Sequence, residues 1–334
     1  MVDPQLLSGN AIFYSVKAGI IVKCHRCILN RSICLSSIPL FLILLVGLQT
    51  SAASMASNDI NESSLATFDF AIAETLNAIG HPPMFLAGLK GYETYSRQDN
   101  VIPNTTNLGS RFLPNYELLA HHPPEHILIS PPAHVSLIPR LREIADVKEY
   151  TLYNFSDDVN AEQNHWEAVE ELTRELGSLV NDSVAAEQYV ERTNSYFDDL
   201  KNQLNSIDVP LLIVRLVDER HARIYGKGGV EGMVINRLGL QNAWQRDLGQ
   251  WGSITVSAVA LSNIKAQIIF LESPYDPPGG QRQLLYDGQW RHLPTVKEGN
   301  YTIVPINYWS WGGFPSALRF ADSLVEALEG PTTP

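Results

Sequence analysis

The sequence predicts an α/β protein of two lobes with mostly parallel sheets, joined by a helical connector. Its 334 residues, 45% of them hydrophobic, supply enough apolar material for two modest cores. Short apolar runs alternate with helical patterns from residue 64 to residue 153, and the alternation resumes at residue 209. Residues 160–207 between these regions hold no proline and a single glycine, which is typical of helix. Alternating strands and helices indicate sheets that are parallel or mostly parallel.

A secretory signal peptide is expected over residues 1–53. An apolar run at 38–48 follows Lys23, Arg26 and Arg31 and precedes a stretch of small residues, the three parts of such a signal. The run is shorter than the roughly 20 residues that cross a bilayer, so we predict an exported, soluble mature chain. All three cysteines lie within the first 34 residues, and neither a disulfide nor a thiolate metal site is expected after them.

The first lobe is expected at residues 54–159 and the connector at residues 160–207. Candidate strands of the lobe lie at 65–70, 84–89, 126–130 and 149–153, and candidate helices at 72–79 and 135–144. Apolar residues recur at helical spacing through the connector: Trp166, Val169, Leu172, Leu176 and Leu179, then Val190, Phe197 and Leu204. The connector is therefore one long helix, or two helices broken near residues 177–182.

The second lobe is expected at residues 208–330. Candidate strands lie at 211–217, 222–225, 267–271 and 302–305, and candidate helices at 230–238, 257–264 and 316–328. The last helix is the best defined, because Pro315 stands in its first turn and Gly330 at its end. The lobes resemble each other faintly, since an early helix of each is followed by a glycine, Gly80 or Gly239.

Composition and motifs exclude several functions. The chain has 24 Lys and Arg against 36 Asp and Glu, a net charge of −12, which argues against nucleic acid as a partner. It lacks a Gly-x-Ser-x-Gly elbow, a phosphate-binding glycine loop and a His-Glu-x-x-His motif. The adjacent pair His121 and His122 cannot both point at one ion from a regular element, so we interpret it as a solvated loop. No catalytic residue and no metal site is predicted.

Two loops rich in aromatic residues are the best candidates for a binding surface. Tyr308, Trp309, Trp311 and Phe314 follow the candidate strand that ends at residue 305, and Trp251 stands in a second glycine-containing loop. Ligands of open α/β sheets bind at the carboxyl ends of the strands, which is where the first of these loops begins. Arg111, just before a candidate helix, is the natural cation for an anionic oxygen of a ligand.

A series of motifs occurs in order between about residue 65 and residue 330. The series comprises Gly109-x-Arg111-x-x-Pro114-Asn115-x-Glu117-Leu-Leu119, Arg220-His221 with Tyr225-Gly226, Asn242-Ala-Trp244, Trp251-Gly-Ser253, and Trp311 with Ser316-Ala317-x-x-Phe320. This series resembles the periplasmic ferric-hydroxamate siderophore-binding proteins of ABC importers. The resemblance implies two α/β lobes joined by a long rigid backbone helix, with the ligand in a shallow cleft between the lobes.

The resemblance also implies ligand contacts in that cleft. On the matched positions, Arg111 would bond the iron-chelating oxygens, while Trp251 and Trp311 would pack on the carbon skeleton of the siderophore. The loop from Tyr308 to Trp311 is one residue longer than in the family, so either Trp309 or Trp311 can occupy the matched place.

One matched position departs from the family. Ala133 stands where the family has a tyrosine that contacts the ligand, and the neighbouring His134 is the candidate substitute. The siderophore itself fills the coordination sphere of Fe(III). Neither a protein ligand to the iron nor a cofactor is therefore expected.

Partner proteins follow from the same resemblance. Glu74 matches a family glutamate that docks on the importer, and in the second lobe Glu231 lies two residues before the matched position, which Met233 occupies. The expected partners are a ferric siderophore, an inner-membrane ABC permease and its ATPase, met in the periplasm by a monomer.

Two alternatives to siderophore binding stay open from the residues. The same scaffold could deliver haem or cobalamin, against which the Trp251-Gly-Ser253 block argues. A secreted hydrolase is the alternative from another class, with Asp218 and His221 as its candidate acid and base.

Overall fold

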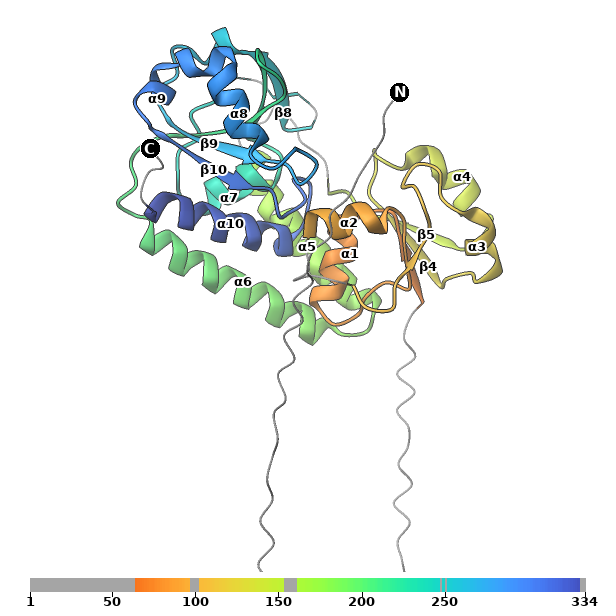
Figure 1. Ribbon diagram of the computed structural model, residues 1–334. Helices are drawn as coiled ribbons and strands as arrows, with labels where there is room; N and C mark the ends of the chain where they lie inside the picture. Colours follow the sequence, from red (N-terminus) through yellow and green to blue (C-terminus); the bar gives the residue numbers. More distant parts are fainter. Residues whose placement is uncertain (1–63, 97–101, 153–160, 247, 250, 331–334) are drawn as a thin grey trace, which may run out of the picture. The chain divides into compact units, whose positions relative to one another are not determined.

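The computed structural model describes residues 64–96, 102–152, 161–246, 248–249 and 251–330, with the side chains of residues 161–164 left out. The predicted signal peptide at residues 1–53 lies outside the described residues. The rest contains two five-stranded sheets with helices packed on them, and the predicted α/β class is confirmed. We call the part built on the first sheet the first lobe and the part built on the second sheet the second lobe (Figure 1).

The first sheet is wholly parallel, in the strand order β3-β2-β1-β4-β5. The elements of the first lobe are β1 (Leu65–Thr67), α1 (Phe70–Ala78), β2 (Phe85–Leu86), α2 (Leu89–Ser96), β3 (Thr106–Asn107), α3 (Tyr116–His121), β4 (His126–Ile129), a 3-10 turn (Val135–Leu137), α4 (Ile138–Leu141) and β5 (Asp146–Glu149). Asp69 begins α1, because its carboxylate accepts from the backbone N–H groups of Ala71 at 2.8 Å and Ile72 at 3.3 Å. Gly80, at φ 89°, follows the end of that helix.

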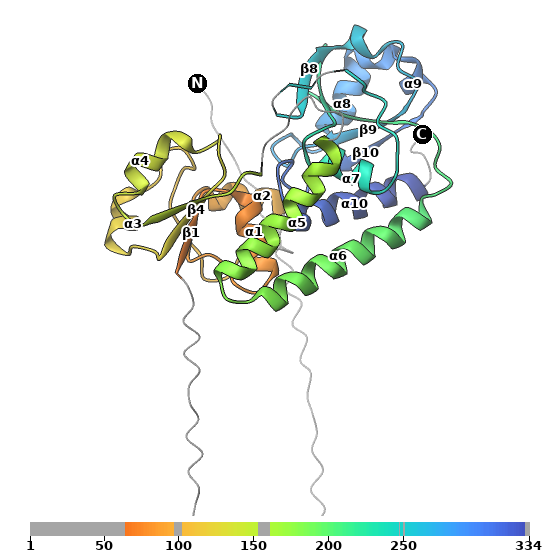
Figure 2. The same cartoon turned by 180° about the vertical axis from the view of Figure 1, so that it is seen from behind.

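The connector is two helices, so the second of the two predicted arrangements is the observed one. They are α5 (Ala161–Leu179) and α6 (Ser183–Gln203). Asp182 sets the start of α6 by accepting from the backbone N–H of Ala185 at 3.0 Å. The helix α5 packs on α1 of the first lobe and on α7 (Val230–Arg237) of the second lobe, as Figure 2 shows.

The second sheet is mixed, in the order β10-β9-β6-β7-β8, with β10, β9 and β6 parallel and β7 and β8 antiparallel. Its strands are β6 (Leu211–Leu216), β7 (His221–Tyr225), β8 (Ser253–Ser257), β9 (Gln267–Glu272) and β10 (Tyr301–Pro305), and its further helices are α8 (Gly280–Asp287), α9 (Pro294–Lys297) and α10 (Phe314–Glu329). The helix expected at 257–264 is a short 3-10 turn, Ala258–Leu261, preceded by β8. The strand β8 was not predicted, because this edge strand is mostly exposed and partly polar and so lacks a run of apolar residues.

Side chains of β6 alternate between two cores, as they must on a strand covered on both faces. Leu211 and Ile213 join the core shared with α1, α5, α7 and α10, whereas Leu212 and Val214 point into the opposite core. The first of these cores runs without interruption from Leu65 of the first sheet into the second lobe. The two lobes are therefore joined by apolar packing as well as by the connector.

Among the described residues, none of the helices combines the length and the apolar character that a bilayer span requires.

We predict that Gly177→Ala destabilises the helical pair. A Cβ on Gly177 would lie 2.3 Å from the Cβ of Ala186, so α5 and α6 would have to separate. Overpacking of this kind costs about 1–3 kcal/mol, more than the ~1 kcal/mol that alanine gains over glycine in a helix. Urea denaturation of the purified protein measures the net loss. Ser178→Ala, at an exposed neighbouring position, is the matched control and should change stability little; a more stable Gly177→Ala protein would contradict the close crossing.

Candidate ligand-binding site

A hollow of about 380 Å³ lies where loops of the two lobes meet. The first lobe contributes Arg111, Phe112 and Ala133, and the second contributes Arg223, Trp251, Ser253, Trp309 and Trp311. The structure thus brings together the predicted arginine and all three tryptophans that the sequence singled out. Ala133 forms part of the wall at the position where the matched tyrosine is missing.

Arg111 is held in place by the backbone and by aromatic rings. Its Nε donates to the carbonyl oxygen of Phe68 at 2.8 Å, and its guanidinium lies 4.4 Å from the ring centre of Phe70 and 5.3 Å from that of Trp309. The carboxylate of Asp69, wholly buried, lies 3.8 Å from the guanidinium and balances its charge. Arg111 therefore presents a fixed, planar donor group to the hollow.

A glycine allows Arg111 this position. Gly88 has φ 78°, and a Cβ built on it would lie 2.7 Å from the Cγ of Arg111. The stem of the arginine passes directly over this backbone, so Gly88 meets both a conformational and a steric requirement.

The tryptophans form a connected aromatic wall. The ring centres of Trp309 and Trp311 are 5.1 Å apart, and those of Trp251 and Trp311 are 6.4 Å apart, with edge-to-face geometry in both pairs. The indole N–H of Trp311 donates to the carbonyl oxygen of Trp251 at 3.2 Å, which joins the two loops. Trp309 also contacts Phe70 and Tyr95 of the first lobe, with ring centres 5.1 and 5.0 Å away.

Glu74 does not lie on the surface, so its predicted role as a docking contact for a permease is wrong. Its side chain is 1% exposed, and its carboxylate accepts from the backbone N–H of Gly313 at 2.7 Å, the hydroxyl of Ser316 at 2.9 Å and the guanidinium of Arg319 at 2.7 Å. Burial raises the pKa of Glu74, and Arg319 opposes that rise. Glu74 belongs to the first lobe and its partners belong to the second. Its hydrogen bonds therefore hold the end of the aromatic loop against the first lobe.

Glu231 is also buried, and the prediction that it docks on a partner is wrong for the same reason. Its carboxylate accepts from the hydroxyls of Tyr308 at 3.0 Å and Ser310 at 2.8 Å. Burial raises the pKa of Glu231 to about 7, although these hydrogen bonds lower it. Tyr308 is fully buried, with its ring 4.9 Å from that of Phe320, and so it does not line the hollow as the sequence suggested.

His134 does not replace the missing tyrosine in the wall. The side chain is fully buried, with ring centres of Phe68 and Phe112 at 6.1 and 5.8 Å, and neither ring nitrogen has a hydrogen-bond partner among the described residues. Burial lowers the pKa of His134 to about 4, so the ring is neutral at pH 7. Phe112, which is 60% exposed, lies on the same wall of the hollow.

Sequence reasoning missed Arg223, the second arginine of the hollow. Arg223 sits at the centre of β7, between the buried residues Ala222 and Ile224. A charged residue between two buried residues of a strand indicates that one face of the sheet is exposed to solvent. The sequence alone does not show which loops cover that face.

Asp218 and His221, the candidate hydrolase pair, do contact each other, but Asp218 stabilises a turn of the backbone. The ring Nδ1 of His221 lies 2.9 Å from the carboxylate of Asp218, and both side chains are exposed. The same carboxylate accepts from the backbone N–H groups of Arg220 and His221 at 2.7 Å, which closes the turn between β6 and β7. These backbone bonds are the main reason that the pKa of Asp218 falls to about 2.

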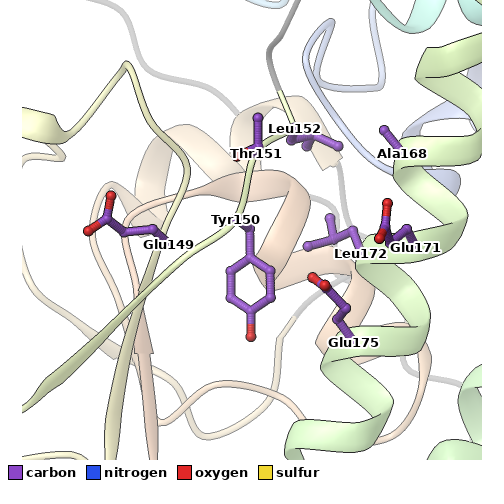
Figure 3. A pocket seen from close by; sticks show the side chains of 8 residues that line it. All are labelled: Glu149, Tyr150, Thr151, Leu152, Ala168, Glu171, Leu172 and Glu175. Atoms are coloured by element: carbon purple, nitrogen blue, oxygen red, sulfur yellow. The ribbon is translucent and has the colours of Figure 1, made fainter.

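A second hollow, between the end of β5 and α5, is smaller and acidic (Figure 3). Its volume is about 240 Å³, and Glu149, Tyr150, Glu171 and Glu175 are among the residues around it. Glu149 points away from the other two carboxylates and is paired with Arg142 at 2.8 Å. The remaining negative charge makes this hollow a poor place for an anionic ligand, so the aromatic hollow is the better candidate site.

Comparison with known proteins gives a consistent result. Residues 65–306 match the periplasmic binding protein family. The iron(3+)-hydroxamate-binding protein FhuD of Escherichia coli is 26% identical over 283 residues, which cover 84% of this chain and 92% of that protein. Among solved structures, FhuD of Vibrio cholerae bound to Fe3+-Desferal is similar with a TM-score of 0.70 and 23% identity, covering 80% of this chain and 98% of that one. FhuD2 of Staphylococcus aureus with bound ferrioxamine B has a TM-score of 0.61 and 17% identity, with coverage of 80% and 98%.

We predict that Glu231→Gln removes a pH dependence of stability. The pKa of this carboxyl is about 7 in the folded chain, above its ordinary 4.5, so its stabilising protonated form is lost as the pH rises through about 7. Glutamine cannot ionise. The difference in unfolding free energy between the variant and the wild type should shift in favour of the variant from pH 5 to pH 8, by up to roughly 3 kcal/mol. Denaturation at several pH values measures the difference, with the exposed Glu143→Gln as control; parallel curves for Glu231→Gln and wild type would contradict the prediction.

Proposed function

Because the chain belongs to the periplasmic binding protein family, we propose that it is the substrate-binding component of an ABC importer and binds a ferric hydroxamate siderophore. The family resemblance inferred from the sequence motifs is confirmed. Membership makes the chain a binding protein and not an enzyme, which removes the hydrolase alternative. The iron complex is cargo and not a cofactor.

The observation that carries the proposal is the composition of the hollow between the lobes. Three hydroxamates neutralise Fe(III) overall but leave electron-rich oxygens on one face of the complex, and the remainder is peptide or alkyl chain. The fixed guanidinium of Arg111 suits the oxygens, and the wall of Trp251, Trp309 and Trp311 suits the apolar remainder. The described E. coli relative is named for the same class of ligand.

The cellular compartment and the partner proteins form part of this proposal. We infer capture of the complex in the periplasm by a monomer, followed by delivery to an inner-membrane permease and its ATPase. The buried positions of Glu74 and Glu231 leave the residues that meet the permease unassigned.

Titration of the purified chain with ferrioxamine B, followed by tryptophan fluorescence, tests the proposal. The iron complex should quench the fluorescence of the aromatic wall in a saturable manner, and iron-free ligand should bind more weakly. Haem and cobalamin, the alternatives on the same scaffold, are titrated in parallel. The proposal would be wrong if haem or cobalamin bound saturably while neither ferrioxamine B nor another ferric trihydroxamate bound.

We predict that Arg111→Gln lowers the affinity for ferrioxamine B by roughly ten-fold or more, because a charge-assisted hydrogen bond is lost. Arg111→Lys should also weaken binding, since lysine keeps the charge but not the planar donor group. Fluorescence titration gives both affinities. Arg142→Gln, an exposed arginine of the same lobe outside the hollow, should bind as the wild type does. Unchanged affinity in Arg111→Gln would remove this residue from the site.

We predict different consequences for two tryptophans of the wall. Trp251 is 41% exposed, so Trp251→Ala should lower affinity roughly ten-fold with little loss of stability. Trp309 packs on Phe70, Tyr95 and Trp311, so Trp309→Ala should lower affinity and also cost about 3 kcal/mol of stability. Titration and thermal melting separate the two effects. A large drop in melting temperature with intact affinity in Trp251→Ala would make that ring a structural residue.

A further inference from the structure

Two arginines stand directly opposite each other in the second sheet. Arg215 of β6 and Arg223 of β7 are register partners in an antiparallel pair, so their side chains share one face of the sheet. Like charges in this arrangement repel each other. Arg215 is compensated, since the carboxylate of Asp276 lies 2.6 Å from its guanidinium.

Arg223 differs from Arg215 in its ion pairing. Among the described residues, no carboxylate forms an ion pair with it, whereas Arg111 has Asp69 at 3.8 Å and Arg215 has Asp276. Its positive charge reaches the phenols around it. Burial raises the pKa of Tyr225 to about 12, and Arg223 opposes that rise.

The uncompensated charge faces the candidate site. Arg223 lines the hollow together with Trp251 and Ser253 of the second lobe, opposite Arg111 of the first. Because Asp69 balances Arg111, the described residues that line the hollow carry a net positive charge from Arg223. The whole chain carries −12, so this is a local exception to a field that repels anions.

We propose that Arg223 selects ferric siderophores that carry a negatively charged group, such as a carboxylate, on the part of the ligand that faces the second lobe. This inference rests on the proposed function and refines its class of ligand. A neutral trihydroxamate complex satisfies Arg111 and the tryptophan wall but leaves Arg223 without a counter-charge. A cationic tail on the ligand is repelled, and an anionic tail gains a charge-assisted hydrogen bond.

A matched set of ligands isolates the charge. Ferrioxamine B ends in a free amine and is cationic, its N-acetyl derivative is neutral, and its N-succinyl derivative ends in a carboxylate; the three share the same iron-hydroxamate core. The wild type should bind the succinyl derivative roughly ten-fold or more tightly than ferrioxamine B, with the acetyl derivative between them. Added salt should reduce this ratio, because the interaction is electrostatic and partly exposed.

Two variants show whether Arg223 is the cause. Arg223→Gln should bring the three affinities close together, and its melting temperature should not fall, because repulsion with Arg215 is relieved. Arg220→Gln removes the same charge from an exposed turn outside the hollow and should keep the wild-type ratio.

The outcomes separate this inference from the proposed function. Equal affinities of the wild type for the three derivatives, or an unchanged ratio in Arg223→Gln, would overturn the inference and leave the proposed function standing. Failure of the wild type to bind any of the three derivatives or any other ferric trihydroxamate would overturn the proposed function and this inference with it.

Discussion

The arrangement of the candidate binding site depends on one buried carboxylate of the first lobe that accepts hydrogen bonds from the second lobe. Glu74 of α1 accepts from Gly313, Ser316 and Arg319 at the start of α10, all in the second lobe. A buried charge that loses its partners costs about 3–5 kcal/mol, so this contact resists rearrangement. Gly312 makes the approach possible, because a Cβ there would lie 2.5 Å from the carboxylate. The loop that carries Trp309 and Trp311 ends at Gly313, whose backbone N–H is one of the groups bound to Glu74.

Apolar packing around Glu74 extends the constraint to the whole interface. Phe314, two residues before Ser316, lies with its ring centre 4.8 Å from that of Trp166 on α5. The same core contains buried residues of both sheets, so a wide opening of the lobes would expose apolar area at roughly 25 cal/mol per Å². Figure 2 shows α5, α1 and α10 gathered along this interface. The walls of the hollow are therefore largely formed before a ligand arrives, which reduces the entropic cost of binding.

The fold was predictable because strand and helix alternation leaves a direct periodic signal, and the aromatic site was predictable because tryptophans in loops are uncommon and follow strand ends. The errors share a physical cause. Glu74 and Glu231 look like surface residues because isolated acids are usually solvated, and only the tertiary contacts with Arg319 or with the hydroxyls of Tyr308 and Ser310 make their burial affordable. Arg223 was missed because cross-strand register is not written in the local pattern.

The two buried glutamates act on the same loop but differ in electrostatic character. Glu74 is paired with a guanidinium, so its negative charge is compensated inside the protein. Among the described residues, Glu231 has two hydroxyl donors and no cationic partner, so burial is only partly offset and its pKa rises to about 7. Burial raises the pKa of both carboxyls, but the Glu74 carboxylate lies against the guanidinium of Arg319, whereas Glu231, bonded to Tyr308, changes charge near neutral pH. The hydroxyl of Ser310 donates to Glu231, and its carbonyl oxygen accepts from the backbone N–H of Val230. A change in the charge of Glu231 therefore acts on a residue at the centre of the aromatic loop. Trp309 and Trp311 flank Ser310 in the sequence, so the carboxyl that titrates is bonded to the residue between the two tryptophans of the loop.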